Sequence, residues 1–194
     1  LGVNISPILV GSGALLVGVG LGLQGLFLDF VSGVIILFDR TVKVGDIVDL
    51  DGNIGEVQEI RMRTTAILTR DNKNMVFPNS LLTKEKLINF SLYDNIVRFH
   101  VDVGVHYDSD VALVERLMIE AAKETKDIFQ SKEPFVFLED FGDSSLNFSL
   151  YYYSRNLFSA PRIRNEVRKA ILRKFRENNV NIPYPIRTVV YPKA

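Results

Sequence analysis

The chain has 194 residues, of which 47% are hydrophobic, and its 23 Lys and Arg residues balance 23 Asp and Glu residues. Zero formal net charge removes the overall attraction to nucleic acid that a strongly basic chain has. The chain contains no cysteine, which excludes disulfides, thiolate nucleophiles and cysteine-based zinc sites.

The N-terminal segment differs from the rest of the chain in charge. Residues 1–28 carry no charged side chain, whereas charges are spread normally from Asp39 onward. Residues 5–24 would be about 30 Å long as a helix, which matches the hydrocarbon thickness of a bilayer. A buried core helix is the alternative, and a signal peptide is disfavoured because a basic start is missing. We predict a transmembrane helix, and the start at Leu1 rather than Met suggests part of a longer protein.

Residues 20–25, GLGLQG, match the G-x-G-x-x-G pattern of dinucleotide-binding loops. A strand, a glycine loop, a helix and a second strand ending in Asp39 could be placed around it. This alternative predicts a soluble Rossmann-like enzyme. The supposed helix lacks a solvated face, however, and no further βαβ units follow.

A helical interpretation of the same glycines predicts a packing surface. At about 100° per residue, the small residues fall on two flanks, separated by a narrow apolar ridge that contains Val17 and Leu21. Two small flanks predict a neighbour on each side, and therefore a symmetric ring with the ridge towards its axis. Rings of Val17 and Leu21 would then form a pore constriction that closes by dewetting. The predicted packing residues are Gly11, Gly13, Ala14, Gly18, Gly20 and Gly22.

The regular pattern ends at Gly25. Residues 26–38 form a second apolar stretch whose polar and small residues gather on one side. This pattern predicts an amphipathic helix that lies along a membrane face or packs on the following domain, with one continuous helix as the alternative. Arg40 and Lys43 follow at once, which indicates a cytoplasmic end. The residues grouped on one side are Asp29, Ser32 and Gly33.

The remaining chain reads as two soluble parts. Residues 40–91 show short alternating strands and tight turns, typical of a small β-barrel or sheet. Residues 92–194 read as strand, helix, two strands and helix, with a short final strand at 188–192, which is the order of a ferredoxin-like sandwich. RNA-recognition domains share this order, so an RNA-binding module is a further alternative, although their glycine-aromatic signature is missing. We identify no nucleophile–base pair that would support catalysis.

Four stretches together resemble the small-conductance mechanosensitive channel (MscS) family. They are GVGLGLQG at 18–25, VSGVIILFDRTVKVGDIVDL at 31–50, VFPNSLL at 76–82 and INFS at 88–91. The resemblance implies a multidomain membrane protein in which membrane tension opens a pore for ions and small osmolytes during hypoosmotic shock. It implies no enzymatic activity, no cofactor and no nucleic-acid partner.

The resemblance also implies an architecture. Residues 1–39 would form a glycine-rich pore-lining helix and a kinked amphipathic helix, 40–91 an Sm-like β domain, and 92–194 a ferredoxin-like α+β domain whose last strand joins a C-terminal barrel. Val17 and Leu21 match the constriction rings, Gly25 the kink and Gly33 a second hinge. The expected partners are further copies in a homoheptamer and membrane lipids. The expected location is the bacterial inner membrane, multi-pass in the full-length protein, with the C-terminal domains in the cytoplasm.

Overall fold

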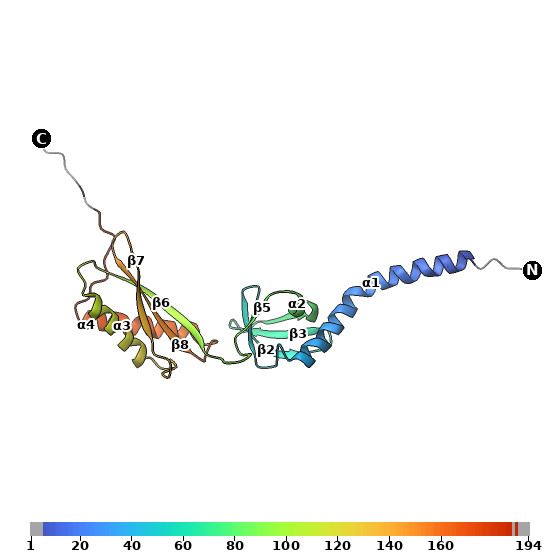
Figure 1. Cartoon of the computed structure of the whole chain (residues 1–194), viewed down its shortest axis with the longest axis horizontal. Helices are drawn as coiled ribbons and strands as arrows, with labels where there is room; N and C mark the ends of the chain where they lie inside the picture. Colours follow the sequence, from blue (N-terminus) through green and yellow to red (C-terminus); the bar gives the residue numbers. More distant parts are fainter. Residues whose placement is uncertain (1–5, 188, 190–194) are drawn as a thin grey trace, which may run out of the picture. The chain divides into compact units, whose positions relative to one another are not determined.

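The computed structural model describes residues 6–187 and residue 189, with side chains from residue 9 onward. The chain divides into two compact units, residues 1–94 and residues 95–194 (Figure 1). We describe each unit by itself and call them the N-terminal and the C-terminal unit.

One long helix, α1 (Ser6–Asp39), begins the N-terminal unit. It is uninterrupted at Gly25, so the two predicted helical segments are joined in one helix, and its axis bends along its length (Figure 1). The helix ends because Arg40 adopts a left-handed conformation with φ of 53°, from which its N–H donates to the Ile36 carbonyl at 3.0 Å.

A five-stranded antiparallel sheet follows α1 in the N-terminal unit. Its order is β4-β3-β2-β1-β5. The short strands and tight turns of residues 40–91 predict a small β-barrel or sheet, but they do not predict this order. Between β1 and β2, Asp51 and Gly52 both have positive φ, which is the geometry of a two-residue hairpin turn. The strands are β1 (Ile47–Leu50), β2 (Asn53–Ile60), β3 (Thr64–Thr69), β4 (Asn74–Pro78) and β5 (Leu87–Asn89).

A short helix, α2 (Asn79–Lys84), connects β4 to β5 and was not predicted from the sequence. At six residues it is too short to show a helical repeat of apolar positions. The core of this unit takes residues from the sheet, from α2 and from the end of α1, where Ile36 is 1% exposed. The buried core residues are Ile36, Val42, Val48, Leu50, Val57, Ile67 and Leu82.

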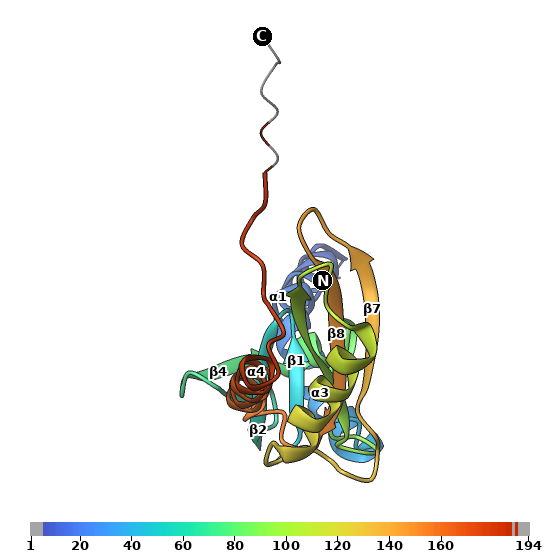
Figure 2. The ribbon, with the colours of Figure 1, turned by 90° about the vertical axis from the view of Figure 1, so that its left-hand side faces the viewer.

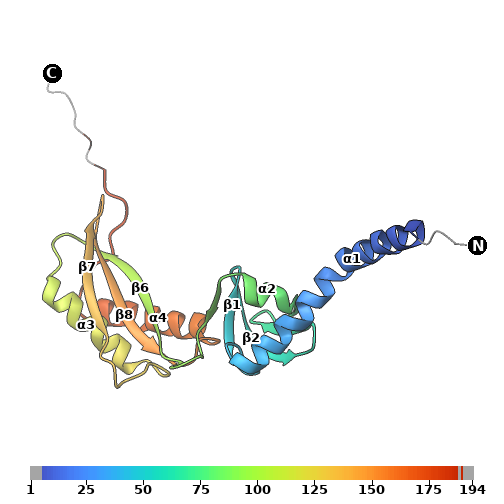
Figure 3. The same ribbon diagram turned by 45° about the vertical axis from the view of Figure 1, so that its right-hand side comes forward.

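The C-terminal unit has the predicted order of strand, helix, two strands and helix. Its elements are β6 (Val97–Val105), α3 (Val111–Glu124), β7 (Phe135–Phe141), β8 (Leu146–Ser154) and α4 (Ala160–Glu177). The antiparallel sheet has the order β6-β8-β7, in which the long β7–β8 hairpin stands out in Figure 3. Helices α3 and α4 pack together on this sheet, and Figure 2 views α4 nearly along its axis.

The side chain of Asp110 caps the start of α3. Asp110 Oδ1 accepts hydrogen bonds from the Ala112 and Leu113 amides, at 2.9 and 3.3 Å. The predicted final strand, 188–192, lies outside the described residues except for Val189, which is in no strand.

Candidate functional site: the two halves of α1

The first part of α1 is not covered by any other helix or strand among the described residues. We call residues 9–27 the free half of the helix, and all of them are exposed. The ridge residues Val17 and Leu21 are 64% and 68% exposed. The described helix Leu9–Asp39 is long and apolar enough to cross a membrane. An apolar surface this continuous is stable only against lipid or other protein.

The glycines of the free half are not packed against any other part of the described residues. A Cβ atom built at any of them meets no heavy atom within 4 Å. Glycine in a helix interior costs about 0.5–1 kcal/mol relative to alanine, so the set lowers the stability of the isolated helix with no gain inside one chain. Any packing role must therefore come from molecules outside this chain. The glycines are Gly11, Gly13, Gly18, Gly20, Gly22 and Gly25.

The second part of α1 packs on its own unit. We call residues 28–39 the docked half, and it lies against α2 (Figure 3). Its buried residues are Ser32, Gly33 and Ile36. This is the side on which the sequence groups Asp29, Ser32 and Gly33, so packing on the β domain is confirmed for that side.

Three contacts cross this junction in order around the helix. The Ser32 and Thr83 hydroxyls are 2.8 Å apart. The Asp29 carboxylate accepts from Ser80 Oγ at 2.5 Å and from the Ser80 amide at 3.3 Å. Gly33 approaches so closely that a Cβ atom there would collide with the Met62 carbonyl oxygen and with the side chain of Asn79.

Asn79 fixes the β2–β3 turn beside Gly33. It is fully buried, and its Oδ1 accepts from Thr65 Oγ1 at 2.8 Å. Its Nδ2 donates to the Arg61 carbonyl at 2.9 Å, and its backbone N–H donates to the Arg63 carbonyl at 2.9 Å. One residue therefore holds both ends of the turn, which keeps the Met62 carbonyl against the helix.

The segment after α1 is held by a second polar cluster. Asp46 Oδ2 accepts from the Lys43 amide at 2.9 Å and from Asn89 Nδ2 at 2.8 Å. Asn89 Nδ2 also donates to the Thr41 carbonyl at 2.9 Å. The end of α1 is thus tied to β5, so movement of the docked half would be transmitted to the sheet.

The dinucleotide-binding interpretation of GLGLQG is wrong on structural grounds. The motif lies in the interior of α1, whereas a phosphate-binding loop needs a strand before the glycines and a helix start after them. Within the described residues, no group of three or more His, Asp or Glu residues could hold a metal ion.

Aromatic residues of the C-terminal sheet divide between its two faces. Tyr152 and Phe148 are buried in the core. On the other face Phe137 is 55% exposed, and Phe135 stacks on Tyr151 with ring centroids 5.1 Å apart. The Tyr151 hydroxyl donates to the Glu139 carboxylate at 2.9 Å. The Arg98 guanidinium lies 5.2 Å from the centre of the Tyr151 ring, and the Glu139 carboxylate offsets its charge. These rings therefore lack the excess positive charge that attracts RNA phosphates.

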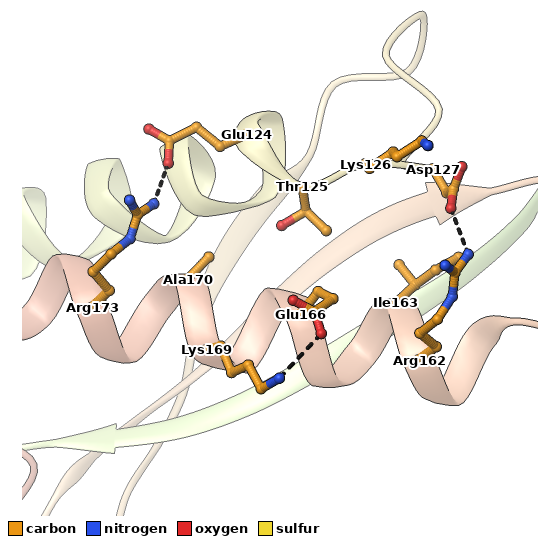
Figure 4. Close-up of a pocket in the computed structure, with 10 residues that line it drawn as sticks. All are labelled: Glu124, Thr125, Lys126, Asp127, Arg162, Ile163, Glu166, Lys169, Ala170 and Arg173. Atoms are coloured by element: carbon orange, nitrogen blue, oxygen red, sulfur yellow. Dashed lines mark hydrogen bonds and ion pairs between the residues drawn. The ribbon is translucent and has the colours of Figure 1, made fainter.

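A charged groove lies between the end of α3 and α4 (Figure 4). Its three carboxylates are paired with bases from α4: Asp127 with Arg162 at 2.9 Å, Glu166 with Lys169 at 3.2 Å and Glu124 with Arg173 at 2.7 Å. The Glu166–Lys169 pair lies within α4, whereas Glu124 and Asp127 connect the end of α3 and the residues after it to α4. Paired charges of this kind mainly neutralise each other, so the groove is assigned to packing rather than to chemistry.

The most buried charge of the C-terminal unit is Lys174. Its Nζ contacts Glu124 at 2.7 Å and Glu120 at 3.1 Å, which joins α4 to α3. The hydrogen bond to Glu124 raises the pKa of Lys174, and the same bond lowers the pKa of Glu124. Both shifts show that the folded state favours the charged forms.

Sequence reasoning missed most of the junction between the docked half and the β domain. It grouped Asp29, Ser32 and Gly33 correctly but identified neither Ser80 nor Asn79 as their partners. The polar pair Asn79-Ser80, directly after the Pro78 that closes a strand, is the feature of the sequence that could have indicated these partners.

Family models and relatives of known name match most of this chain. Residues 25–92 match the family model for the mechanosensitive ion channel beta-domain, and residues 99–182 match the model for the mechanosensitive ion channel MscS C-terminal domain. The mechanosensitive channel MscK of Escherichia coli is 39% identical over 171 residues, covering 88% of this chain and 15% of MscK. The small-conductance mechanosensitive channel of Edwardsiella ictaluri is 32% identical, covering 86% of this chain and 58% of that protein.

A solved structure agrees over the whole chain. The closed-state crystal structure of Helicobacter pylori MscS superposes with a TM-score of 0.88 at 25% identity, covering 100% of this chain and 76% of that one. An apolar helix of membrane-spanning length, followed by these two domains, is thus the architecture of a mechanosensitive channel subunit. The chain belongs to the MscS family.

Proposed function

We propose that this protein is a mechanosensitive ion channel that membrane tension opens, releasing ions and small osmolytes on hypoosmotic shock. The observation that carries the proposal is the free half of α1. Its apolar residues and its glycines are exposed on all sides of the helix, and no other described element covers them. A pore lined by copies of this helix would give both sets of residues a use. The names of the curated relatives favour the same activity, although this chain spans only 15% of MscK.

In the proposed assembly, seven copies form a ring around the free halves. Gly11, Gly13, Ala14, Gly18, Gly20 and Gly22 lie between neighbouring helices, where small side chains allow close approach. Val17 and Leu21 point to the axis and form the constriction. Gly25 is the hinge between the free and docked halves, and Gly33 is a second hinge.

The proposed location is the bacterial inner membrane, in a multi-pass full-length protein. The β domain and the C-terminal unit would lie in the cytoplasm, in accord with the basic residues Arg40 and Lys43 that follow α1. The residues 1–39, 40–91 and 92–194 would then act as pore, β and α/β domains. We propose no catalysis, cofactor or nucleic-acid partner for this chain.

Patch recording under graded suction tests the proposal. The full-length gene is expressed in membranes that lack other channels of this kind. We expect large, uniform current steps above a reproducible tension. Silence, with the protein demonstrated in the membrane, would contradict opening by tension.

A further inference from the structure

We propose that the β2–β3 turn, Arg61-Met62-Arg63, binds the headgroups of anionic phospholipids at the cytoplasmic surface of the membrane. The inference rests on the proposed membrane position of α1 and adds a lipid contact made by the β domain. The turn is exposed throughout, and the Met62 side chain is 69% exposed although its carbonyl is pressed against Gly33.

The depth of the β2–β3 turn in the membrane follows from the position along α1 that it contacts. Asp29 is the first charged residue of the chain, so it marks the end of the segment that can lie in hydrocarbon. Gly33 lies four residues later, about 6 Å further along the helix axis. The headgroup layer on each side of a bilayer is about 5–7 Å thick. Met62 touches α1 at Gly33, so the turn lies at headgroup depth.

The turn also lies next to an exposed apolar stripe of α1. Around the helix, the contacts run from Ser32 with Thr83, through Asp29 with Ser80, to Gly33 with Met62. The turn is therefore at one edge of the docked sector. Beyond that edge, within about 100° of Gly33, come the exposed residues Phe30, Val34 and Leu37. The exposed Met62 adds apolar surface to the β domain at this edge.

The charges of the turn favour an anionic surface. Arg61 pairs with Glu59 at 2.8 Å, while the Arg63 guanidinium has no hydrogen-bond or ion-pair partner among the described residues. An apolar side chain between two arginines suits the boundary where acyl chains meet phosphates. Guanidinium groups bind phosphate oxygens with two parallel hydrogen bonds. Anionic lipids of the cytoplasmic leaflet supply these phosphates together with net negative charge.

The test uses the absence of tryptophan from the sequence. In Met62→Trp, the introduced indole becomes the only tryptophan side chain within these 194 residues. Any tryptophan elsewhere in the full-length protein is replaced by phenylalanine before the measurement. The protein is reconstituted in phosphatidylcholine vesicles with a minor fraction of phosphatidylglycerol, and only carbonate-resistant, inserted protein is measured. The two vesicle preparations carry bromine, which quenches tryptophan fluorescence, on the phosphatidylglycerol chains or on the same mole fraction of phosphatidylcholine chains.

We expect the fluorescence of Met62→Trp to be quenched more by brominated phosphatidylglycerol than by brominated phosphatidylcholine. The expected enrichment of anionic lipid is about fivefold for each arginine that contributes. Arg61→Gln with Arg63→Gln, in the Met62→Trp background, should remove the difference between the two lipids. The matched control is Tyr93→Trp, which replaces a side chain 96% exposed near the end of the same unit. Its fluorescence should not be quenched.

Three outcomes would overturn the site: an unquenched Met62→Trp protein, equal quenching of that protein by both lipids, or quenching of the Tyr93→Trp control to the same extent. Absence of quenching in Met62→Trp would assign the turn to contact with water or another protein. The readout needs no current, so it separates this proposal from the channel proposal. A conducting channel without quenching disproves only the lipid site, and a silent protein with the expected quenching disproves only the opening by tension.

Discussion

The two halves of α1 have similar sequences and opposite surroundings. Both are apolar and both contain glycine, yet the free-half glycines meet nothing within 4 Å while Gly33 is closed in by Met62 and Asn79. The polar residues make the difference. Asp29 and Ser32 find partners on α2, whereas the free half has no charged residue that could anchor it to a soluble domain. One helix thus combines an exposed half, which can pack only against other molecules, with a half that packs on its own β domain.

The largest expected effect comes from a charge on the ridge of the free half. Leu21→Asp should hydrate the proposed constriction, because a ring of carboxylates abolishes dewetting. We expect growth inhibition on expression and current at zero applied tension. Leu21→Val, which keeps the ridge apolar, is the control and should grow normally. Unchanged growth and unchanged threshold in Leu21→Asp, at normal expression, would remove Leu21 from the constriction.

Alanine at one glycine in each half tests the comparison directly. Gly33→Ala places a methyl group against the Met62 carbonyl, and we expect it to destabilise docking by about 1–3 kcal/mol. Gly22→Ala should instead stabilise the isolated helix by about 0.5–1 kcal/mol and weaken the assembly. Thermal unfolding in detergent and light scattering of the oligomer measure the two effects.

Either of two results would contradict the proposed difference between the two halves. A stable Gly33→Ala protein would mean that the β2–β3 turn yields easily, in spite of the bonds that Asn79 makes to it. An unchanged oligomer in Gly22→Ala would mean that this flank does not pack against a neighbour.

The hydrogen bonds of the docked half give a smaller effect. A double-mutant cycle of Asp29→Ala and Ser80→Ala isolates the hydrogen bond between their side chains from the rest of the junction. We expect a coupling of about 1.5 kcal/mol, typical of a hydrogen bond to a charged group. Thermal unfolding of the four proteins measures it, and additive single effects would show that the contact contributes nothing to docking.

The sequence predicts what local patterns can encode. The apolar length of residues 5–24 predicts a membrane helix, and the short alternating strands and tight turns of residues 40–91 predict a small β domain. These features depend on residues that are neighbours in the chain. The same locality explains why the β-α-β-β-α order of the C-terminal unit could be predicted.

The junction could not be predicted because its partners are far apart in sequence. What faces Gly33 is set by Met62 and Asn79, which only the folded sheet brings together. A wheel of α1 shows which residues share a side, but not whether that side meets α2, lipid or another copy. Six-residue α2 carries too little periodicity to be distinguished from a loop. The roles of Val17, Leu21, Gly25 and Gly33 in gating therefore stay predictions.

The smallest expected effect concerns the contact between α3 and α4, which differs in kind from the glycine contact between α1 and the β domain. In the C-terminal unit, α3 and α4 are joined by charges around Lys174 rather than by glycine packing. Because the folded pKa of Glu124 is lowered, its contribution is present above the unfolded pKa of about 4.3 and is lost as the pH falls through the folded value. Because the folded pKa of Lys174 is raised, its contribution is present below about 10.4 and is lost as the pH rises through the folded value.

Hydrogen exchange of α3 and α4 amides against pH measures this effect. We expect protection to fall at both ends of the pH range, and Lys174→Gln to reduce both changes. Lys169→Gln, at an exposed pair on the same helix, is the control and should behave like the unmodified chain. The contact of Gly33 with the Met62 carbonyl contains no titratable group. The stability of that contact should therefore not change over the pH range in which Glu124 and Lys174 titrate. A pH profile that Lys174→Gln leaves unchanged would mean that the buried charges do not join these helices.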